Sequence, residues 1–329
     1  MNIQKGENLM KNYFIINPKA GKGKHAEALE TQIRSACEHC GADFEIYLTT
    51  AVGDATRFVR EKCAEGDSLP ARFFACGGDG TLGEVVNGAV GVAGAYVGLI
   101  PSGTGNDFVR NFSEKELFFD IEAQIGGENV QVDVLKCNDL YAINMINIGF
   151  DCEVVKKKEA IQSRGILPAK LAYIFGLVGT LARKPGVRAA ISFDGEGGTD
   201  TKYLLTTFAN GKFCGGGFHS NPFAALNDGE CDVLLVNDIS RTRFVSLVGS
   251  YKKGTHINPK TAKILSSRKA QSVDIEFFGT QSISVDGELF DFERITISCV
   301  RGALGFTVPR GVKLPEYFAA NAEKESVLV

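Results

Sequence analysis

Residues 77–88 read Gly-Gly-Asp-Gly-Thr-Leu-Gly-Glu-Val-Val-Asn-Gly and follow the apolar run 72–76, Arg-Phe-Phe-Ala-Cys. The pattern predicts a buried strand, a glycine turn and a helix that opens at Thr81. Glycines without Cβ atoms let successive backbone N–H groups point at phosphate oxygens. Asp79 would repel phosphate unless a cation lies between them, so the turn indicates a metal-bound nucleotide. The alternative is an ordinary strand-to-helix connection capped by Asp79.

Two further turns follow strand-like runs in the same way. Residues 95–100 lead into 101–108, which are rich in glycine, hydroxyl and acid, and residues 13–16 end in 17–24, Asn-Pro-Lys-Ala-Gly-Lys-Gly-Lys. The second of these turns lacks Walker A spacing and fits the dinucleotide fingerprint only loosely, although helical spacing over 25–40 follows it. Turns at the ends of adjacent parallel strands converge on one crevice.

Length and composition point to two domains. The chain has 329 residues, of which 44% are hydrophobic, enough for more than one core. Strand and helix patterns alternate through about residue 125, which predicts an α/β domain with parallel strands. We place the crossover in the turn 126–129, giving domains over 1–129 and 130–310. The second is predicted to be all-β from closely spaced strand-like runs at 132–135, 141–145, 188–193, 203–208 and 283–285.

Charge and cysteine content exclude several partners. The net charge of −3 gives the chain as a whole no attraction to nucleic acid or to an anionic bilayer. Residues 1–10 carry no apolar signal core, and an odd number of cysteines, nine, suits buried thiols in a reducing cytoplasm. Cys37 and Cys40 form a lone CxxC without a second pair, which favours a structural role over zinc binding.

Basic residues bracket the apolar run 171–182. That run is too short to span a bilayer, which needs about twenty residues. A solvated helix face and a basic rim that meets lipid headgroups are both open, so peripheral membrane contact is the most that we expect. The basic residues are Lys156, Lys157, Lys158, Arg164, Lys170, Arg183 and Lys184.

Taken together, the three turns resemble those of the diacylglycerol kinase catalytic family, the soluble lipid kinases that include bacterial diacylglycerol kinases and sphingosine and ceramide kinases. The resemblance is strongest at 77–88, then at 101–108 and 17–24, and extends to 164–173, 214–217, 227–229 and 286–288. It implies an α/β nucleotide-binding domain like that of the NAD and diacylglycerol kinases. A β-sandwich-like domain for the lipid substrate follows, and residues 311–329 return to the first domain.

The resemblance also implies a set of nucleotide contacts with ATP and Mg²⁺ as cofactors. Lys19 or Lys24 would neutralise phosphate charge, Asp79 would hold magnesium directly or through water, and Thr49 and Thr104 match family nucleotide contacts. Gly83 stands where the family more often has Asn, which bears on fine specificity. The remaining residues of the expected nucleotide site are Asn17, Gly21, Gly77, Gly78, Gly80, Thr81, Glu84, Gly103, Asn106 and Asp107.

Two acidic turns remain. In residues 286–288, Asp-Gly-Glu, the family carries its proton acceptor at the position of Glu288; Asp286 is the second choice, and a plain hairpin turn is the alternative. We expect this base to act across the domain cleft. In bacterial members a structural magnesium is bound at the position of Asp228, which here implies Asp228 with the backbone carbonyls of Ala225 and Glu230.

Three functions are compatible with these features. The leading one is an ATP-dependent lipid kinase that phosphorylates a hydroxyl of diacylglycerol or a related lipid, with an apolar cleft lined by 214–218 and 171–182. The others are an NAD kinase and a non-catalytic nucleotide-sensing protein of the same fold. A kinase of this kind would be cytoplasmic, transiently at the inner face of the membrane, and would bind no nucleic acid. The sequence leaves the oligomeric state open, a homodimer included.

Overall fold

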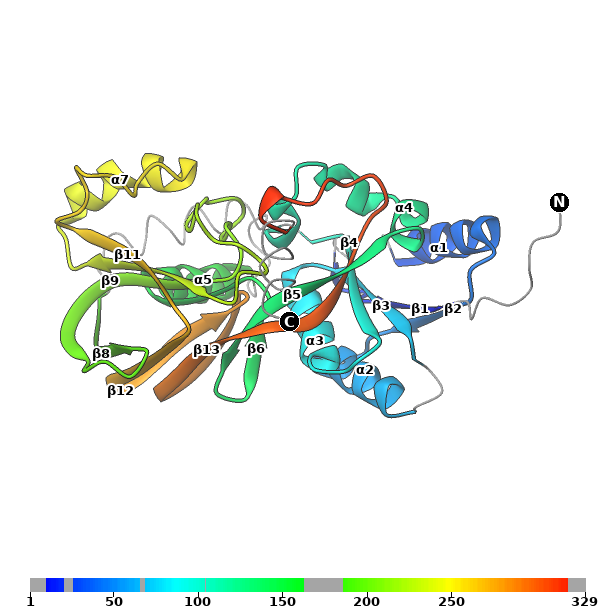
Figure 1. The fold of residues 1–329 in the computed structure, drawn as a ribbon, viewed down its shortest axis with the longest axis horizontal. Helices are drawn as coiled ribbons and strands as arrows, with labels where there is room; N and C mark the ends of the chain where they lie inside the picture. Colours follow the sequence, from blue (N-terminus) through cyan, green and yellow to red (C-terminus); the bar gives the residue numbers. More distant parts are fainter. Residues whose placement is uncertain (1–9, 21–25, 66–68, 104, 163–185, 319–329) are drawn as a thin grey trace, which may run out of the picture. The chain divides into compact units, whose positions relative to one another are not determined.

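The computed structural model describes residues 10–20, 26–65, 69–103, 105–162 and 186–318. They form two compact units: unit 1 comprises the described residues of 1–103, 112–132 and 303–314, and unit 2 those of 104–111, 133–302 and 315–329. The helices, shown in Figure 1, are α1 (Ala26–Cys40), α2 (Asp54–Ala64), α3 (Asp79–Ala89), α4 (Ile121–Ile125), α5 (Phe150–Gln162), α7 (Arg241–Lys253) and the 3₁₀ helices η2 (Phe108–Asn111) and η3 (Lys115–Phe119). The strands are β1 (Lys11–Ile16), β2 (Phe44–Leu48), β3 (Ala71–Gly77), β4 (Ala95–Pro101), β5 (Glu128–Cys137), β6 (Leu140–Ala142), β7 (Met145–Gly149), β8 (Val187–Phe193), β9 (Thr199–Ala209), β10 (Cys231–Asn237), β11 (Leu265–Ala270), β12 (Ser272–Val285) and β13 (Glu288–Val308).

Unit 1 is a three-layer α/β structure. Its strands lie in the order β2, β1, β3, β4 and the end of β13, and all of them are parallel. Figure 1 shows α1 and α4 on one face of this sheet and α2 and α3 on the other. The α/β fold predicted from the alternating pattern is confirmed.

Successive residues of β1 explain the two covered faces. Phe14 stacks on Phe74 with ring centroids 5.0 Å apart, in the core beneath α1. Tyr13 points the other way, where its ring lies 5.9 Å from that of Phe58 on α2. Because neighbouring side chains of a strand face opposite sides, an uninterrupted apolar run is required where both faces are buried.

The return of the chain to unit 1 occurs earlier than expected. The predicted returning segment was 311–329, whereas the segment 303–314 belongs to unit 1 and residues 105–111 belong to unit 2. The reason is strand pairing, since Gly305 and Phe306 pair in parallel with Tyr96 and Val97 of β4. The single strand expected over 141–145 is instead split into β6 and β7.

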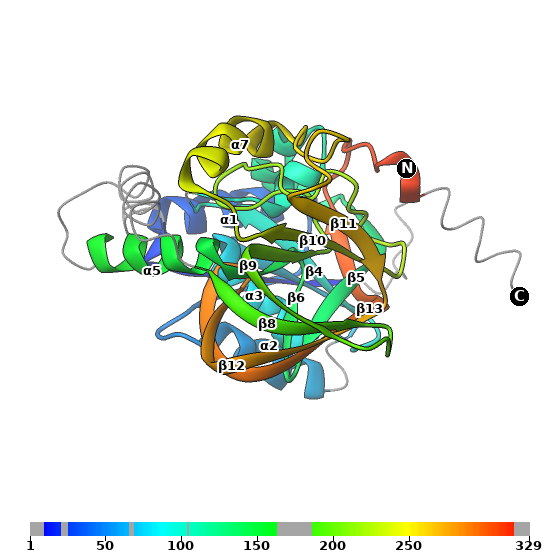
Figure 2. The same cartoon turned by 90° about the vertical axis from the view of Figure 1, so that its left-hand side faces the viewer.

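Unit 2 is mainly antiparallel. The strand β7 pairs with β9 and β12, and β8 pairs with the same two strands, so these four close on themselves. Beyond β9 the sheet continues through β10 to β11. The all-β character expected of the second part of the chain is confirmed for its core, which α5 and α7 cover on one side (Figure 2).

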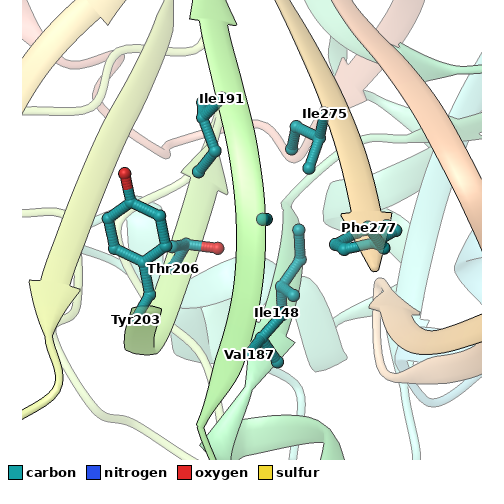
Figure 3. A pocket seen from close by; sticks show the side chains of 8 residues that line it. Ile148, Val187, Ile191, Tyr203, Thr206, Ile275 and Phe277 are labelled. Carbon is teal, nitrogen blue, oxygen red and sulfur yellow. The ribbon is translucent and has the colours of Figure 1, made fainter. Parts of the chain in front are cut away.

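The interior of the four closed strands is filled by apolar side chains. Figure 3 shows Ile148, Val187, Ile275 and Phe277 meeting there, and the seam between the lining residues has no room for a group the size of water. This seam is therefore packed core, and a lipid chain does not fit it as it stands. Among the helices that the structure describes, none is long and apolar enough to cross a bilayer.

Candidate active site

The three predicted turns meet at the carboxyl edge of the unit 1 sheet. Asn17, just past β1, donates its backbone N–H to the carbonyl of Cys76 on β3 at 3.1 Å. Its side-chain Nδ2 donates to Oγ1 of Thr81 on α3 at 3.3 Å. Ser102, just past β4, donates its N–H to the carbonyl of Gly77 at 2.8 Å. Adjacent parallel strands therefore bring the turns together, as their order in the sequence predicts.

The glycines at 77 and 78 are required by the close approach of these turns. A Cβ atom on Gly77 would lie 2.2 Å from Oγ1 of Thr81, and one on Gly78 would lie 3.3 Å from Cα of Gly103. By contrast, a Cβ on Gly83 would meet nothing within 4 Å. A side chain at Gly77 would thus clash with the first turn of α3, and one at Gly78 would press on the turn after β4.

Asp79 lies at the N-terminus of α3, at the edge of the sheet where the turns meet. It is the first residue of α3, it follows the extended Gly78, and both it and Gly80 are half-buried. The positive end of the helix favours an anion here. A carboxylate oxygen in this position suits Mg²⁺ bound directly or through water, so the residues present fit the ion that the resemblance implies.

A hollow of about 70 Å³ lies beside these turns within unit 1. It brings together five predicted residues from three places in the chain, the turn after β1, the end of β2 and helix α3: Asn17, Lys19, Thr49, Thr81 and Glu84. The N–H of Thr49 donates to the carbonyl of Ile16 at 2.9 Å, which places the end of β2 next to the end of β1. The hollow is lined in addition by residues that sequence reasoning did not single out: Thr50, Ala51, Val52 and Ala55.

Asp54 holds the loop that supplies these additional residues. Its Oδ2 accepts the N–H of Thr50 at 2.8 Å, and its Oδ1 accepts from Arg57 at 2.6 Å and from the Tyr47 hydroxyl at 2.9 Å. The pKa of this carboxyl lies well below its usual range, mainly because of the hydrogen bond from the Thr50 N–H and then because of Arg57. The signal in the sequence is Thr-Thr-Ala-Val-Gly-Asp after an apolar run, a fourth turn at the same edge.

Glu84 has a structural part in the hollow. Its Oε2 accepts the N–H of Ala55 at 3.1 Å, and its carbonyl accepts the hydroxyl of Thr56 at 2.8 Å. The carboxylate therefore links α3 to the first turn of α2, and it stabilises the positive N-terminal end of α2. It forms the wall of the hollow whether or not it also touches a nucleotide.

The second predicted turn ends in unit 2, where Asp107 binds a glycine loop. Its Oδ2 accepts the N–H of Gly216 at 2.8 Å, and Nε of Arg110 lies 3.2 Å from its Oδ1. Residues 215–217 all have positive φ, which L side chains rarely adopt. Burial raises the pKa of the Asp107 carboxyl, while the Gly216 hydrogen bond and Arg110 lower it. Asn106 precedes it in a left-handed conformation, with φ of 48°.

Within unit 2 the structure separates the two candidate bases. The Oδ1 of Asp286 accepts the N–H groups of Asn144 at 3.1 Å and Met145 at 2.7 Å, and its Oδ2 accepts that of Ile143 at 2.8 Å. This carboxylate thus fixes the entry to β7. Glu288 is the first residue of β13, opposite Val285, and is half-exposed. The two carboxylates therefore differ in surroundings, and which of them takes the proton stays a prediction.

The acidic loop at Asp228 already contains a cation. Nζ of Lys269 on β11 contacts Oδ2 of Asp228 and lies 3.3 Å from Oδ2 of Asp232 and 3.7 Å from Oε2 of Glu230. Oδ1 of Asp228 accepts the N–H of Glu230 at 3.1 Å. Both oxygens of Asp228 are engaged, so a divalent ion does not fit this loop unless Lys269 moves away. A metal held by Asp228 with the carbonyls of Ala225 and Glu230 stays a prediction.

Comparison with known proteins agrees with this geometry. Residues 11–137 match the family model of the diacylglycerol kinase catalytic domain, and residues 144–308 match that of the YegS C-terminal NAD kinase beta sandwich-like domain. The chain belongs to the diacylglycerol kinase catalytic family. The two models meet near the predicted crossover, and together they include every candidate residue of the site that the structure describes.

The similarity to relatives in this family extends over most of the chain. It is 27% identical over 282 residues to a diacylglycerol kinase of Bacillus subtilis, which covers 84% of this chain and 88% of that one. It is 29% identical over 277 residues to a diacylglycerol kinase of Staphylococcus carnosus, covering 84% and 87%. A crystal structure of a diacylglycerol kinase from Bacillus anthracis str. Sterne shares the fold, with a TM-score of 0.67 and 21% identity over 94% of this chain and 100% of that chain.

Several predictions fall on residues that the structure does not describe. Gly21, Lys24 and Thr104 of the expected nucleotide site lie outside the described residues, as do the apolar run 171–182 and Arg164, Lys170, Arg183 and Lys184. One buried acid next to the Asp228 loop was missed instead. Asp133 is fully buried and accepts the N–H groups of Gly229 at 2.6 Å and Gly302 at 2.7 Å, which anchors the turn that carries Asp228. A lone Asp between valines in a strand was its signal.

Proposed function

We propose that this member of the diacylglycerol kinase family is an ATP-dependent lipid kinase that phosphorylates a hydroxyl of diacylglycerol or a related lipid, giving a phospholipid such as phosphatidic acid. The observation that carries the proposal is the edge of the unit 1 sheet, where the glycine turns, Asp79 and the hollow of about 70 Å³ lie together. Phosphoryl transfer requires a cradle for phosphates, a cation over the developing charge and a group that orients the attacking hydroxyl.

Each requirement has a candidate among the described residues. The N–H groups around Gly78 and the first turn of α3 would bind phosphate oxygens, with Lys19 neutralising part of their charge. Asp79 would hold the magnesium ion, whose contribution when bound is to neutralise charge on the phosphates. Glu288 would accept the proton of the lipid hydroxyl, because Asp286 is committed to three backbone N–H groups.

A kinase of this type would work in the cytoplasm on a lipid presented at the membrane. The nine cysteines are all free thiols in the structure, and burial raises the pKa of Cys37 and of Cys137 to about 12. Such thiols are inert structural groups rather than nucleophiles. ATP and magnesium serve as the cofactors, and the lipid as the acceptor.

The decisive experiment measures transfer from labelled ATP to a panel of lipids in mixed micelles and to NAD. Diacylglycerol or a related lipid is expected to be labelled, and labelling of NAD alone would replace this proposal by an NAD kinase. ATP binding without any transfer would indicate a non-catalytic nucleotide sensor. Asp79→Asn keeps the shape of the turn and is expected to reduce turnover by about a thousandfold while the fold survives. Asp139→Asn, in an exposed turn, is the matched control.

A further inference from the structure

One surface of unit 2 is strongly basic although the chain as a whole is acidic. Residues 241–263 contain six Lys or Arg and no Asp or Glu, in a chain whose net charge is −3. All six side chains are exposed, and none of them forms an ion pair with an acidic residue that the structure describes. We call these six the basic face: Arg241, Arg243, Lys252, Lys253, Lys260 and Lys263.

The helix α7 turns this basic face outward. Its inner side is anchored by Phe244, which is buried, and by Leu247, Val248 and Tyr251, which pack on the core cluster beneath the helix. Val245 lies on the outer side, where 57% of it is exposed, between the two arginines and the two lysines along the helix. The outer side thus has an apolar centre with cations at both ends.

Folding alone does not account for these charges. Lys252 and Lys253 lie in the last turn, where cations favour the helix dipole, so a structural explanation is enough for them. Arg241 and Arg243 lie in the first turn, where the dipole disfavours cations and where no acidic residue is present. The N-terminus is capped instead by the hydroxyl of Ser240, which accepts the N–H of Arg243 at 3.3 Å. Two arginines at this end therefore indicate an external anionic partner.

We propose that the outer side of α7, together with the loop from Gly254 to Lys263, docks on the surface of an anionic lipid bilayer. Each cation near such a surface adds to the attraction, and an exposed apolar side chain can insert at the boundary between headgroups and acyl chains. The proposal rests on the proposed function in one respect, that the lipid acceptor lies in the bilayer to which α7 binds.

A bilayer suits this surface better than a nucleic acid does. Base stacking requires exposed aromatic side chains along a basic groove. On the outer side of α7 the exposed apolar residue is Val245, which gains more from acyl chains than from a sugar-phosphate backbone. Since the apolar face of α7 packs on the protein core, the attraction to a bilayer would come mainly from the exposed cations, with Val245 as a single apolar contact.

This surface differs from the one expected from the sequence. The basic rim was placed around 171–182, a run that lies outside the described residues; of its lysines on α5, Lys156 pairs with Glu153 at 3.4 Å. The helices α5 and α7 share one core cluster, so both cover the same side of the unit 2 sheet (Figure 2).

The test is co-sedimentation of the full chain with vesicles. Vesicles of phosphatidylcholine alone are compared with vesicles that contain phosphatidylglycerol, at low and at high salt. The test variant carries Arg241→Gln, Arg243→Gln, Lys252→Gln and Lys253→Gln. The control variant loses the same number of exposed cations elsewhere, through Arg34→Gln, Arg60→Gln, Lys115→Gln and Lys136→Gln. Thermal unfolding and circular dichroism verify that both variants are folded.

The unmodified chain is expected to bind the anionic vesicles with an affinity that falls as salt rises. The test variant is expected to bind them about a hundredfold more weakly. The control variant should keep most of the binding, and Val245→Gln alone should weaken it severalfold. Equal loss in the two variants would mean a diffuse charge effect and would overturn the proposal, as would preferential binding of duplex DNA over anionic vesicles. Binding needs no ATP, so the result is independent of whether the kinase reaction is found.

Discussion

The assignment of the base can be tested by a pair of conservative substitutions in one turn. Asp286→Asn and Glu288→Gln each replace a carboxylate by an amide of the same size. In the structure the first carboxylate receives three backbone N–H groups, from Ile143, Asn144 and Met145. We therefore expect Asp286→Asn to destabilise the fold locally and Glu288→Gln to remove activity without this effect.

The loss of stability in Asp286→Asn follows from how the three N–H groups are divided between the two carboxylate oxygens. The amide oxygen can keep the two N–H groups now on Oδ1, which lose only their charge assistance. The N–H of Ile143 would face an amide NH₂ and lose its acceptor, which costs about 1–3 kcal/mol. Adding the weakened pair gives about 3 kcal/mol in total. The backbone adds no strain, because φ of Asp286 is 47° and Asn tolerates this conformation.

Asp194 provides a matched control in the same unit. It also has a positive φ, of 50°, and its carboxylate also receives backbone N–H groups, from Gln271 at 2.9 Å and Ser272 at 2.8 Å. Both of these end on the same oxygen, Oδ1, so an amide can keep both. Asp194→Asn is therefore expected to cost less than about 1 kcal/mol.

Amide hydrogen exchange is the appropriate assay, since a chain of two units need not unfold in one step. Exchange of the Ile143–Met145 amides is expected to rise about a hundredfold in Asp286→Asn and to stay unchanged in Asp194→Asn and Glu288→Gln. Turnover should fall by about a hundred- to ten-thousandfold in Glu288→Gln, with ATP affinity retained. If Asp286→Asn leaves exchange unchanged but abolishes transfer, the base is Asp286. If both variants stay active, the turn is only a hairpin.

Three further changes test other parts of the structure. Gly77→Ala should reduce ATP affinity at least about tenfold, because its Cβ would lie 2.2 Å from Thr81. Gly83→Ala, in open space within a helix, should instead raise the thermal midpoint. If calorimetry shows the same ATP affinity for the two variants, the phosphate cradle lies elsewhere. Burial lowers the pKa of His256 to about 4, so the free energy of unfolding should fall as pH drops from about 6.5 to 4. His256→Gln should remove up to about 3 kcal/mol of that fall. If urea titrations give the variant the same pH profile as the unmodified chain, His256 is not the cause of the fall. Lys269→Met should lower the free energy of unfolding by about 2 kcal/mol, because the carboxylates around Asp228 lose their cation. Millimolar magnesium should then restore part of the thermal midpoint of the variant. An unchanged stability of Lys269→Met would show that the ammonium group contributes nothing.

The sequence alone determined the α/β unit and the edge of its sheet at which the candidate turns meet. Strand patterns ending in glycine turns are local signals, and parallel strands necessarily present their carboxyl ends at one edge. For this reason Asn17, Thr49, Thr81 and Glu84 could be predicted from the sequence, and they lie around one hollow. The fourth turn, held by Asp54, was missed because its capping hydrogen bonds look like those of any loop before a helix.

Only the tertiary structure decided what individual charged side chains do. Asp107 and Asp286 both stood among the candidate site residues, yet their oxygens accept N–H groups from Gly216 and from residues 143–145, which are far away in the sequence. Lys269 likewise reaches Asp228 from a different strand. The role of a carboxylate depends on the donors within about 3 Å of it, and folding brings those donors from distant segments, so a local pattern identifies the candidates without deciding between them.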